Sequence, residues 1–257
     1  MMYGQDLFID SPWMNAAGML GFAPPARWPV SEAMGAFITN PISLGPRTPA
    51  AERSLLAYPG GALLHTGLPN PGLSRVLRRY ADRWAQSSLP IWVHLIGSNP
   101  DEIHQMVRRL EGVEGVMAIE LGIPPGAAGE DALAFVSAAY GELPLVVHLP
   151  ITAAGEDWLR RLPNAGASAI SLGGPRGTLP NSSGRPVAGR LVGPSLLPLM
   201  MGAVQSAREV GLPVIAGAGI YRRGDADSLR DAGAWAVQLD TVLWRGWAEA
   251  VTLPAGS

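Results

Sequence analysis

Short, nearly continuous apolar runs recur along this 257-residue chain, separated by amphipathic stretches, and this alternation is the feature that most restricts the fold. Apolar runs of this length are typical of parallel strands that are buried on both faces. A first strand is predicted at residues 13–17. The strands that follow are predicted at residues 36–43, 90–97, 117–123, 144–150, 169–174, 213–220 and 234–243.

The stretches between these runs have helical periodicity. Asn70 is placed to cap one helix, with Pro71 at its first position, and an apolar stripe follows over residues 73–84. A second helix is predicted to begin after Asn99, with acidic residues near its positive end. Eight strands with helices between them predict an α/β fold, a (β/α)8 or TIM barrel, formed by one domain over residues 1–257.

Three segments depart from this repeat. Residues 44–69 and 175–194 are long and rich in glycine and proline. We predict that both are irregular and lie over the carboxyl-terminal mouth of the barrel, where such folds place their sites. After Leu243 too few residues remain for a full-length helix, so the eighth helix is expected to be short or incomplete.

Composition excludes several classes of function. The chain has no cysteine, which excludes disulfides, thiolate metal sites and cysteine nucleophiles. Its net charge of -2 gives no general attraction to nucleic acid. No apolar run is long enough to cross a bilayer, and residues 1–10 lack the pattern of a signal peptide. We therefore expect a cytoplasmic protein that binds a small molecule, and neither nucleic acid nor a membrane.

Several motifs occur in an order and at spacings that resemble one family. They lie at residues 15–18 (NAAG), 59–61 (PGG), 67–72 (GLPNPG), 193–194 (GP), 216–220 (AGAGI) and 237–241 (VQLDT). Together they resemble the class 1 dihydroorotate dehydrogenases over nearly the whole chain. The resemblance implies a barrel that binds FMN at its mouth and acts as an oxidoreductase on a CH–CH donor.

The departures from this resemblance fall on the family's chemistry. The lysine that holds the flavin corresponds to Asn40, and a fifth-strand lysine corresponds to His148. Two asparagines correspond to Leu64 and Gly174. The catalytic base corresponds to Pro125, which has no group that accepts a proton. We therefore predict no useful oxidation of dihydroorotate, and an FMN-dependent oxidoreductase would have to act on another, unidentified substrate.

The phosphate end of an FMN site depends mainly on backbone N–H groups, so it can survive such losses. Its weak point is Asp240, where the resemblance implies a glycine, because a carboxylate repels a phosphate. Arg176, Arg190, Arg222 and Arg223 are candidates to offset that charge. The residues that the resemblance assigns to the cofactor are Ala16, Ala17, Asn40, His148, Gly193, Ala218, Gly219, Asp240 and Thr241.

His94 and His148 occupy equivalent places in two strands that each read Val-His-Leu. By strand alternation both point into the barrel, with Glu120 on the strand between them. One interpretation is a catalytic pair, or a metal site built with that carboxylate. The other is a hydrogen-bonded filling of one barrel layer. His148 is the candidate catalytic residue, and it could also face the flavin.

Three functions remain open: a flavin-dependent oxidoreductase, a flavin-free barrel that serves as a binding or assembly subunit, and a metal-dependent enzyme that uses those three side chains. A homo-oligomer is also expected, because a short eighth helix leaves a barrel flank to be covered. Trp244, Trp247 and Val251 would anchor that interface. The alternative is that residues 1–9 cover the flank within the chain.

Overall fold

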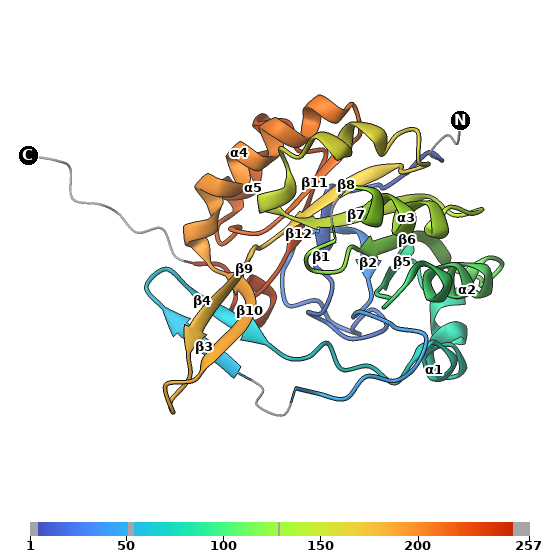
Figure 1. The fold of residues 1–257 in the computed structure, drawn as a ribbon, viewed down its shortest axis with the longest axis horizontal. Coiled ribbons are helices and arrows are strands. Elements are labelled where there is room, and N and C mark those ends of the chain that lie inside the picture. The colour runs from blue at the N-terminus through green and yellow to red at the C-terminus, as the bar shows by residue number, and fades with distance from the viewer. Residues whose placement is uncertain (1–4, 51–53, 128, 249–257) are drawn as a thin grey trace, which may run out of the picture.

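The main body of the protein is a closed barrel of parallel strands, seen in a computed structural model that describes residues 5–50, 54–127 and 129–248. The strands close in the order β1-β2-β5-β6-β7-β8-β11-β12 (Figure 1). Their bounds are β1 (Trp13–Asn15), β2 (Met34–Ile38), β5 (Ile91–Leu95), β6 (Val116–Gly122), β7 (Leu145–Pro150), β8 (Ala169–Gly173), β11 (Val214–Gly217) and β12 (Ala236–Leu239). One strand lies in or across each predicted run, so the predicted barrel is confirmed.

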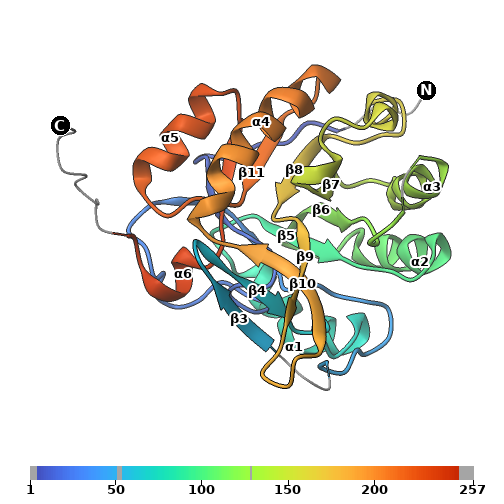
Figure 2. The ribbon, with the colours of Figure 1, turned by 60° about the vertical axis from the view of Figure 1, so that its left-hand side comes forward.

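Helices cover the outside of this barrel (Figure 2). They are α1 (Leu73–Ala85), α2 (Pro100–Leu110), α3 (Glu130–Ala139), α4 (Leu197–Ala207), α5 (Arg223–Asp231) and α6 (Val242–Arg245), with 3-10 turns η1 (Ile151–Ala153), η2 (Asp157–Arg161), η3 (Pro194–Leu196) and η4 (Arg208–Val210). None of the described helices is both long enough and apolar enough to span a bilayer.

One of the two predicted helix caps is confirmed. The Asn99 side chain accepts a hydrogen bond from the Glu102 amide at 2.9 Å and so begins α2. The predicted cap at Asn70 is wrong, because Gly72 occupies the cap position of α1. The Asn70 side chain instead accepts hydrogen bonds from the Gly72 and Ser43 amides, which hold the loop before the helix.

The two segments predicted to be irregular form a second sheet. They contain β3 (Ser54–Tyr58), β4 (Gly61–His65), β9 (Arg176–Pro180) and β10 (Pro186–Val192), which pair in the order β3-β4-β10-β9. These four strands lie side by side at one end of the barrel (Figure 1). The prediction failed because β9 has no buried residue and β10 begins with alternating exposed and buried residues, so neither strand gives a continuous buried apolar run. The pairing places Leu64 opposite Arg190.

The eighth helix is short, as predicted, since α6 spans only Val242–Arg245. Beyond it Trp247 folds back, with its ring 5.9 Å from the ring of Trp13 on β1. Its Nε1 donates a hydrogen bond to Glu32 at 3.3 Å. Trp247 thus covers β1 within the chain, whereas Trp244 is 52 % exposed. Val251 lies outside the described residues.

The lower part of the barrel interior is apolar. Leu7 and Ile9 of the N-terminal segment pack against this layer, so they cover the barrel interior rather than the flank beside α6. This apolar layer comprises Met14, Ala17, Ala36, Ile38, Trp92, Ala118, Val146, Ala169, Ile215 and Ala236.

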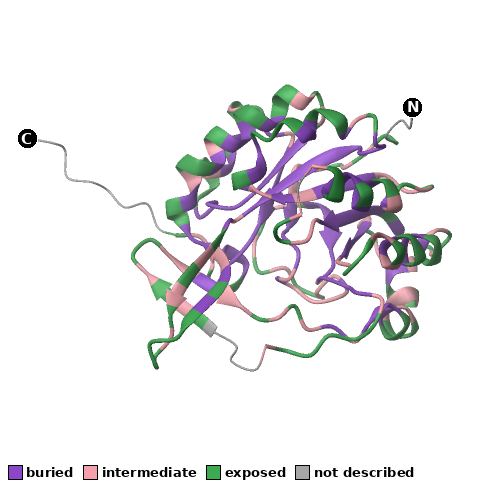
Figure 3. Ribbon diagram, in the orientation of Figure 1, coloured by how far each residue is buried: buried purple, intermediate pink, exposed green. Residues whose placement is uncertain are grey.

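The barrel strands are buried along most of their length, while the surrounding helices alternate between buried and exposed faces (Figure 3).

Candidate functional site

A polar layer follows the apolar layer toward the carboxyl ends of the strands. Its members stand two residues further along their strands than the apolar ones, so strand alternation points them into the same interior. They are His94 on β5, Glu120 on β6, His148 on β7, Ser171 on β8 and Gln238 on β12. Strand register pairs His94 with Glu120 and His148 with Ser171. The predicted grouping of the two histidines with Glu120 is therefore confirmed.

Glu120 is the centre of this cluster and is fully buried. Its Oε2 lies 2.6 Å from His94 Nδ1. Its Oε1 accepts hydrogen bonds from Ser171 Oγ at 2.8 Å and from Gln238 Nε2 at 2.6 Å. Both carboxylate oxygens are thus occupied by donors on three different strands.

His148 joins the cluster through Ser171. Its Nδ1 lies 2.9 Å from Ser171 Oγ but 4.0 Å from Glu120 Oε1, so the hydroxyl stands between imidazole and carboxylate. The His148 side chain is 20 % exposed, whereas that of His94 is 5 % exposed. The rings of the two histidines are 5.4 Å apart in an edge-to-face arrangement. Of the two, His148 is the one that reaches the mouth.

Opposing effects set the ionisation of the cluster. Burial alone would raise the pKa of Glu120, but the hydrogen bond and charge of His94, aided by His148 and Gln238, lower it to about 2. Burial lowers the pKa of His148 to about 4, although the Glu120 carboxylate opposes that change. At neutral pH the layer therefore holds an ionised Glu120 and a neutral His148.

Two glycines make room for the imidazoles. A Cβ at Gly122 would lie 2.9 Å from His94 Nε2, and a Cβ at Gly173 would lie 2.7 Å from His148 Cε1. Real Cβ atoms do not approach other atoms so closely, so neither position accepts alanine without a shift of the ring. The polar layer therefore depends on glycine at these two strand ends.

Asp240 directly follows β12 and is 3 % exposed. Its Oδ1 accepts a hydrogen bond from Thr241 Oγ1 at 3.2 Å, and the backbone N–H groups of Thr241 and Val242 also favour its charged form. Its Oδ2 is buried and has no hydrogen-bond partner among the described residues. Burial raises the pKa of Asp240 despite the nearby charge of Arg190. Such an oxygen is rare in folded proteins and marks incomplete pairing.

Arg190 is the arginine, among the four candidates, whose charge acts on Asp240. It is half-buried on β10, and its charge also acts on Glu120. Burial lowers the pKa of its guanidinium, which nevertheless stays protonated as arginine does in proteins. Arg223, another candidate, pairs instead with Glu32 at 2.5 Å. Arg190 is therefore the arginine that offsets the charge of Asp240.

The other residues predicted to bind the cofactor follow the ends of β1, β2, β10, β11 and β12 in the chain. Ala16, Ala17 and Ala218 are buried, as is Thr241, whose hydroxyl also bonds to the Tyr221 phenol. Asn40 uses its Oδ1 to accept a hydrogen bond from the Gly21 amide at 3.0 Å. Its side-chain oxygen therefore holds the loop after β1.

Gly193 and Gly219 are required by packing. Gly193 has a φ of 142°, and a Cβ there would lie 2.3 Å from the Gly60 carbonyl oxygen in the β3–β4 turn. Gly219 has a φ of 83°, and its Cβ would lie 2.5 Å from the Leu197 amide at the start of α4. A larger residue at either position would disturb the fold, so substitution there does not isolate a role in ligand binding.

The metal interpretation finds no support in this geometry. In the part of the chain that the structure describes, no three histidine, aspartate or glutamate side chains are arranged to hold a metal ion. Each Glu120 oxygen already accepts a hydrogen bond, and Ser171 separates that carboxylate from His148. Pro125, at the position where the resemblance implies the base, lies exposed in the turn after β6.

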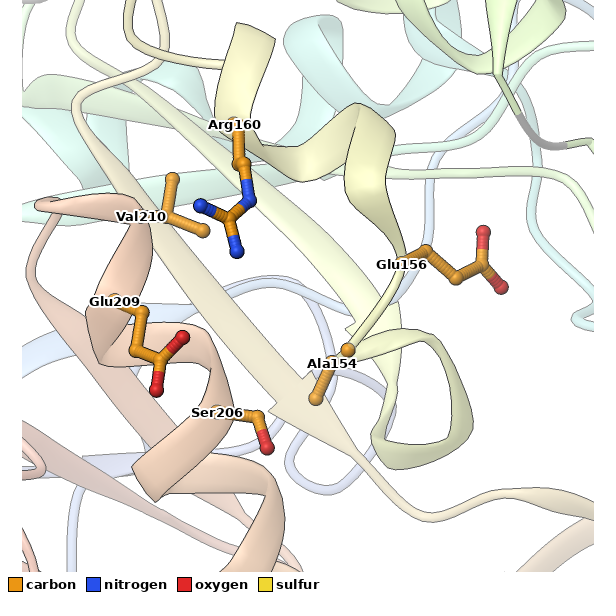
Figure 4. A pocket seen from close by; sticks show the side chains of 7 residues that line it. Ala154, Glu156, Arg160, Ser206, Glu209 and Val210 are labelled. Carbon is orange, nitrogen blue, oxygen red and sulfur yellow. The ribbon is translucent and has the colours of Figure 1, made fainter.

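A separate cavity of about 190 Å³ lies on the flank of the barrel. It opens between the η1–η2 segment and the end of α4, where Arg160 and Glu209 border the same hollow (Figure 4). Its lining is mostly polar. The lining residues belong to the outer turns and to the end of α4, and none of them belongs to the polar layer inside the barrel. We assign it no part in the site.

Sequence reasoning missed Ser171, Gln238 and Tyr221. A signal existed for the first two, since each is a polar residue inside an apolar run that otherwise forms a buried strand. A buried polar side chain on the interior face of a strand needs a partner on that face. Ser171 and Gln238 find these partners in His148 and Glu120, which lie in the same layer of the barrel interior.

The comparisons with known proteins agree with this architecture. No protein-family model matches the chain. The catalytic subunit of dihydroorotate dehydrogenase B (NAD(+)) from Citrifermentans bemidjiense is 30 % identical over 261 residues, covering 91 % of this chain and 83 % of that protein. The chain belongs to the dihydroorotate dehydrogenase family.

Other matches support the same assignment. The corresponding subunit from Trichlorobacter lovleyi is 29 % identical over 276 residues, covering 97 % of this chain and 89 % of that protein. The crystal structure of the Eimeria tenella dihydroorotate dehydrogenase in complex with ferulenol has a TM-score of 0.71 at 18 % identity. It covers 91 % of this chain and 77 % of that one, and it supports the fold alone.

Proposed function

We propose that this chain is an FMN-dependent oxidoreductase of the dihydroorotate dehydrogenase family that acts on a compound other than dihydroorotate. The observation that carries the proposal is the unpaired Oδ2 of Asp240, on which the charge of Arg190 acts at the end of β12. The family resemblance implies that the phosphate of FMN would lie at that end of the barrel. Buried polar atoms are rarely left unpaired, so this is where a ligand would complete the pairing.

The residues at this point fit a phosphate when Asp240 is protonated. A protonated carboxyl group donates one hydrogen bond, and the raised pKa of Asp240 favours that form. Arg190 supplies a fixed positive charge. An ionised Asp240 would offset the charge of Arg190, because the charge of each group acts on the other.

Small buried residues would hold the remainder of the cofactor, namely Ala16 and Ala17 after β1 and Ala218 after β11. FMN, when bound, supplies two-electron oxidation and reduction. The sequence contains no lysine, so Asn40 and the neutral His148 stand where the family resemblance implies lysine. The ring end of the site consequently lacks a fixed positive charge.

The proposed inactivity toward dihydroorotate follows from what surrounds the mouth. Leu64 and Gly174 offer no side-chain hydrogen bond where the resemblance implies asparagine. Each unmet hydrogen bond of a polar substrate costs roughly 1–3 kcal/mol. Pro125 is exposed and has no proton-accepting side chain. A different substrate is therefore proposed for the same barrel.

A second function, a flavin-free binding barrel, is favoured by one observation. The Thr241 and Val242 backbone N–H groups favour the charged form of the Asp240 carboxylate, and Thr241 Oγ1 donates a hydrogen bond to it at 3.2 Å. An ionised Asp240 held there would take the place of the phosphate. A protonated Asp240 thus favours FMN binding, whereas an ionised Asp240 favours the flavin-free barrel.

Turnover of dihydroorotate tests the substrate part of the proposal. The purified protein is supplied with excess FMN, and flavin bleaching is followed without oxygen after dihydroorotate is added. We expect no bleaching beyond that of FMN alone. A rate within tenfold of about 10 s⁻¹, typical of enzymes, would contradict the proposal. Visible absorbance after gel filtration reports separately whether flavin is bound.

A further inference from the structure

We propose that His148 is the proton acceptor of the barrel mouth, with its own ring proton on Nδ1 and the lone pair of Nε2 directed toward the bound ligand. The inference rests on the proposed use of the mouth as a binding site. It does not depend on whether the ligand is accompanied by flavin.

Hydrogen-bond accounting fixes the tautomer. The ionised Glu120 can only accept, so the single hydroxyl proton of Ser171 is donated to its Oε1 at 2.8 Å. The Ser171 oxygen can then only accept from His148 Nδ1, which lies 2.9 Å away. His148 Nδ1 must therefore carry the ring proton. In a neutral imidazole this leaves Nε2 unprotonated.

The position of Nε2 makes its lone pair available. A Cβ on Gly173 would lie 2.9 Å from Nε2, and Gly173 is two residues closer to the carboxyl end of β8 than Ser171. The Nε2 edge of the ring thus faces the mouth. No described residue forms a hydrogen bond with Nε2, and the side chain is 20 % exposed. His94, by contrast, contacts Glu120 directly through Nδ1 and is nearly covered.

The charges around His148 act in opposite directions on the protonation of its ring, which is neutral until a ligand supplies a proton. Glu120 on β6 favours the imidazolium, while His94 on β5 and Arg190 on β10 oppose it. In the proposed step an acidic X–H bond of the ligand breaks, the proton moves to Nε2, and the electron pair stays on the ligand. Ser171 acts as the positioning residue, because it orients the ring and connects it to Glu120.

This assignment gives the mouth a proton acceptor in place of the one lost at Pro125, on a rigid strand and not on a loop. The ligand class that the assignment requires is a small molecule with an acidic proton that can reach Nε2. His148 belongs to β7 of the barrel, whereas Arg190, which is proposed to receive the phosphate, belongs to β10 of the second sheet.

Nuclear magnetic resonance of the full chain labelled with ¹⁵N-histidine tests the tautomer, since the chain has only 4 histidines. Long-range proton–nitrogen correlations at neutral pH should show the proton of His148 on Nδ1. The Ser171→Ala variant removes the acceptor and should give a mixture of tautomers. A proton on Nε2 in the unchanged protein would overturn the proposal, even if the variant fails to fold.

Site-resolved acylation by diethyl pyrocarbonate tests whether the lone pair is accessible. His148 should be modified in the folded protein, while the buried His94, the matched control, should be modified at least tenfold more slowly. Equal protection of both histidines would contradict the proposal. Both experiments use flavin-free protein, so their failure is distinguishable from failure to bind FMN, which a flavin titration measures independently.

Discussion

Replacement of His148 by asparagine should change how the stability of the protein depends on pH. Asparagine keeps an N–H donor near the position of Nδ1 for Ser171, yet it does not titrate. The imidazole of His148 must stay neutral in the folded protein, because its pKa is lowered from 6.5 to about 4 by burial. In the unfolded chain the same ring gains a proton near its ordinary pKa.

The sign and size of the effect follow from this difference. A group with a lowered pKa in the folded state contributes stability that is fully present above its unfolded pKa and is lost as the pH falls through the folded pKa. The window here runs from 6.5 down to about 4. At about 1.4 kcal/mol per pKa unit the loss amounts to about 3 kcal/mol, an upper limit because the side chain is 20 % exposed.

Urea unfolding followed by tryptophan fluorescence measures this loss. Between about pH 7 and pH 4 the unfolding free energy of the unchanged protein should fall more steeply than that of the His148→Asn variant. The raised pKa of Asp240 acts in the opposite direction, but it is common to both proteins and cancels in the difference. The exposed His104, replaced in the same way, is the matched control. Parallel curves for unchanged protein and His148→Asn would refute the reasoning.

Three further predictions concern packing and assembly. Gly173→Ala should destabilise the fold by about 1–3 kcal/mol through overpacking, whereas Gly202→Ala, in open space on α4, should be neutral or stabilising by up to about 1 kcal/mol in the same urea assay. Asn15→Leu should cost about 2 kcal/mol or more in thermal and urea unfolding, because it leaves the buried N–H and C=O of Ile38 unpaired; an unchanged midpoint would contradict this. Light scattering should show an oligomer that Trp244→Arg dissociates, and a monomeric unchanged protein would remove the oligomer prediction.

The barrel could be predicted from the sequence because buried parallel strands leave a direct trace in apolar runs. The second sheet could not, since β9 alternates between exposed and half-buried residues and gives no apolar run. The cap of α1 was misassigned for a similar reason. Asn70 has the right residue type, but its side chain finds the Ser43 amide through a contact between distant segments.

Part of the candidate site was predictable and part depended on three-dimensional contacts. The meeting of His94, Glu120 and His148 follows from strand alternation and the order of the strands. The insertion of Ser171 between imidazole and carboxylate depends on register, which only the folded barrel fixes. The choice of Arg190 from four arginines depends on the pairing of β10 with β4, which was not foreseen.

An FMN titration of the unchanged protein and of two variants tests the central claim most directly. Flavin fluorescence quenching should show one binding site whose affinity increases toward lower pH, because protonation of Asp240 removes a like charge from the phosphate. Asp240→Asn should bind FMN at least tenfold more tightly near neutral pH and lose much of this pH dependence, while Arg190→Met should bind more weakly. No FMN binding by the unchanged protein or by the folded Asp240→Asn variant would contradict the account and leave the flavin-free barrel in its place.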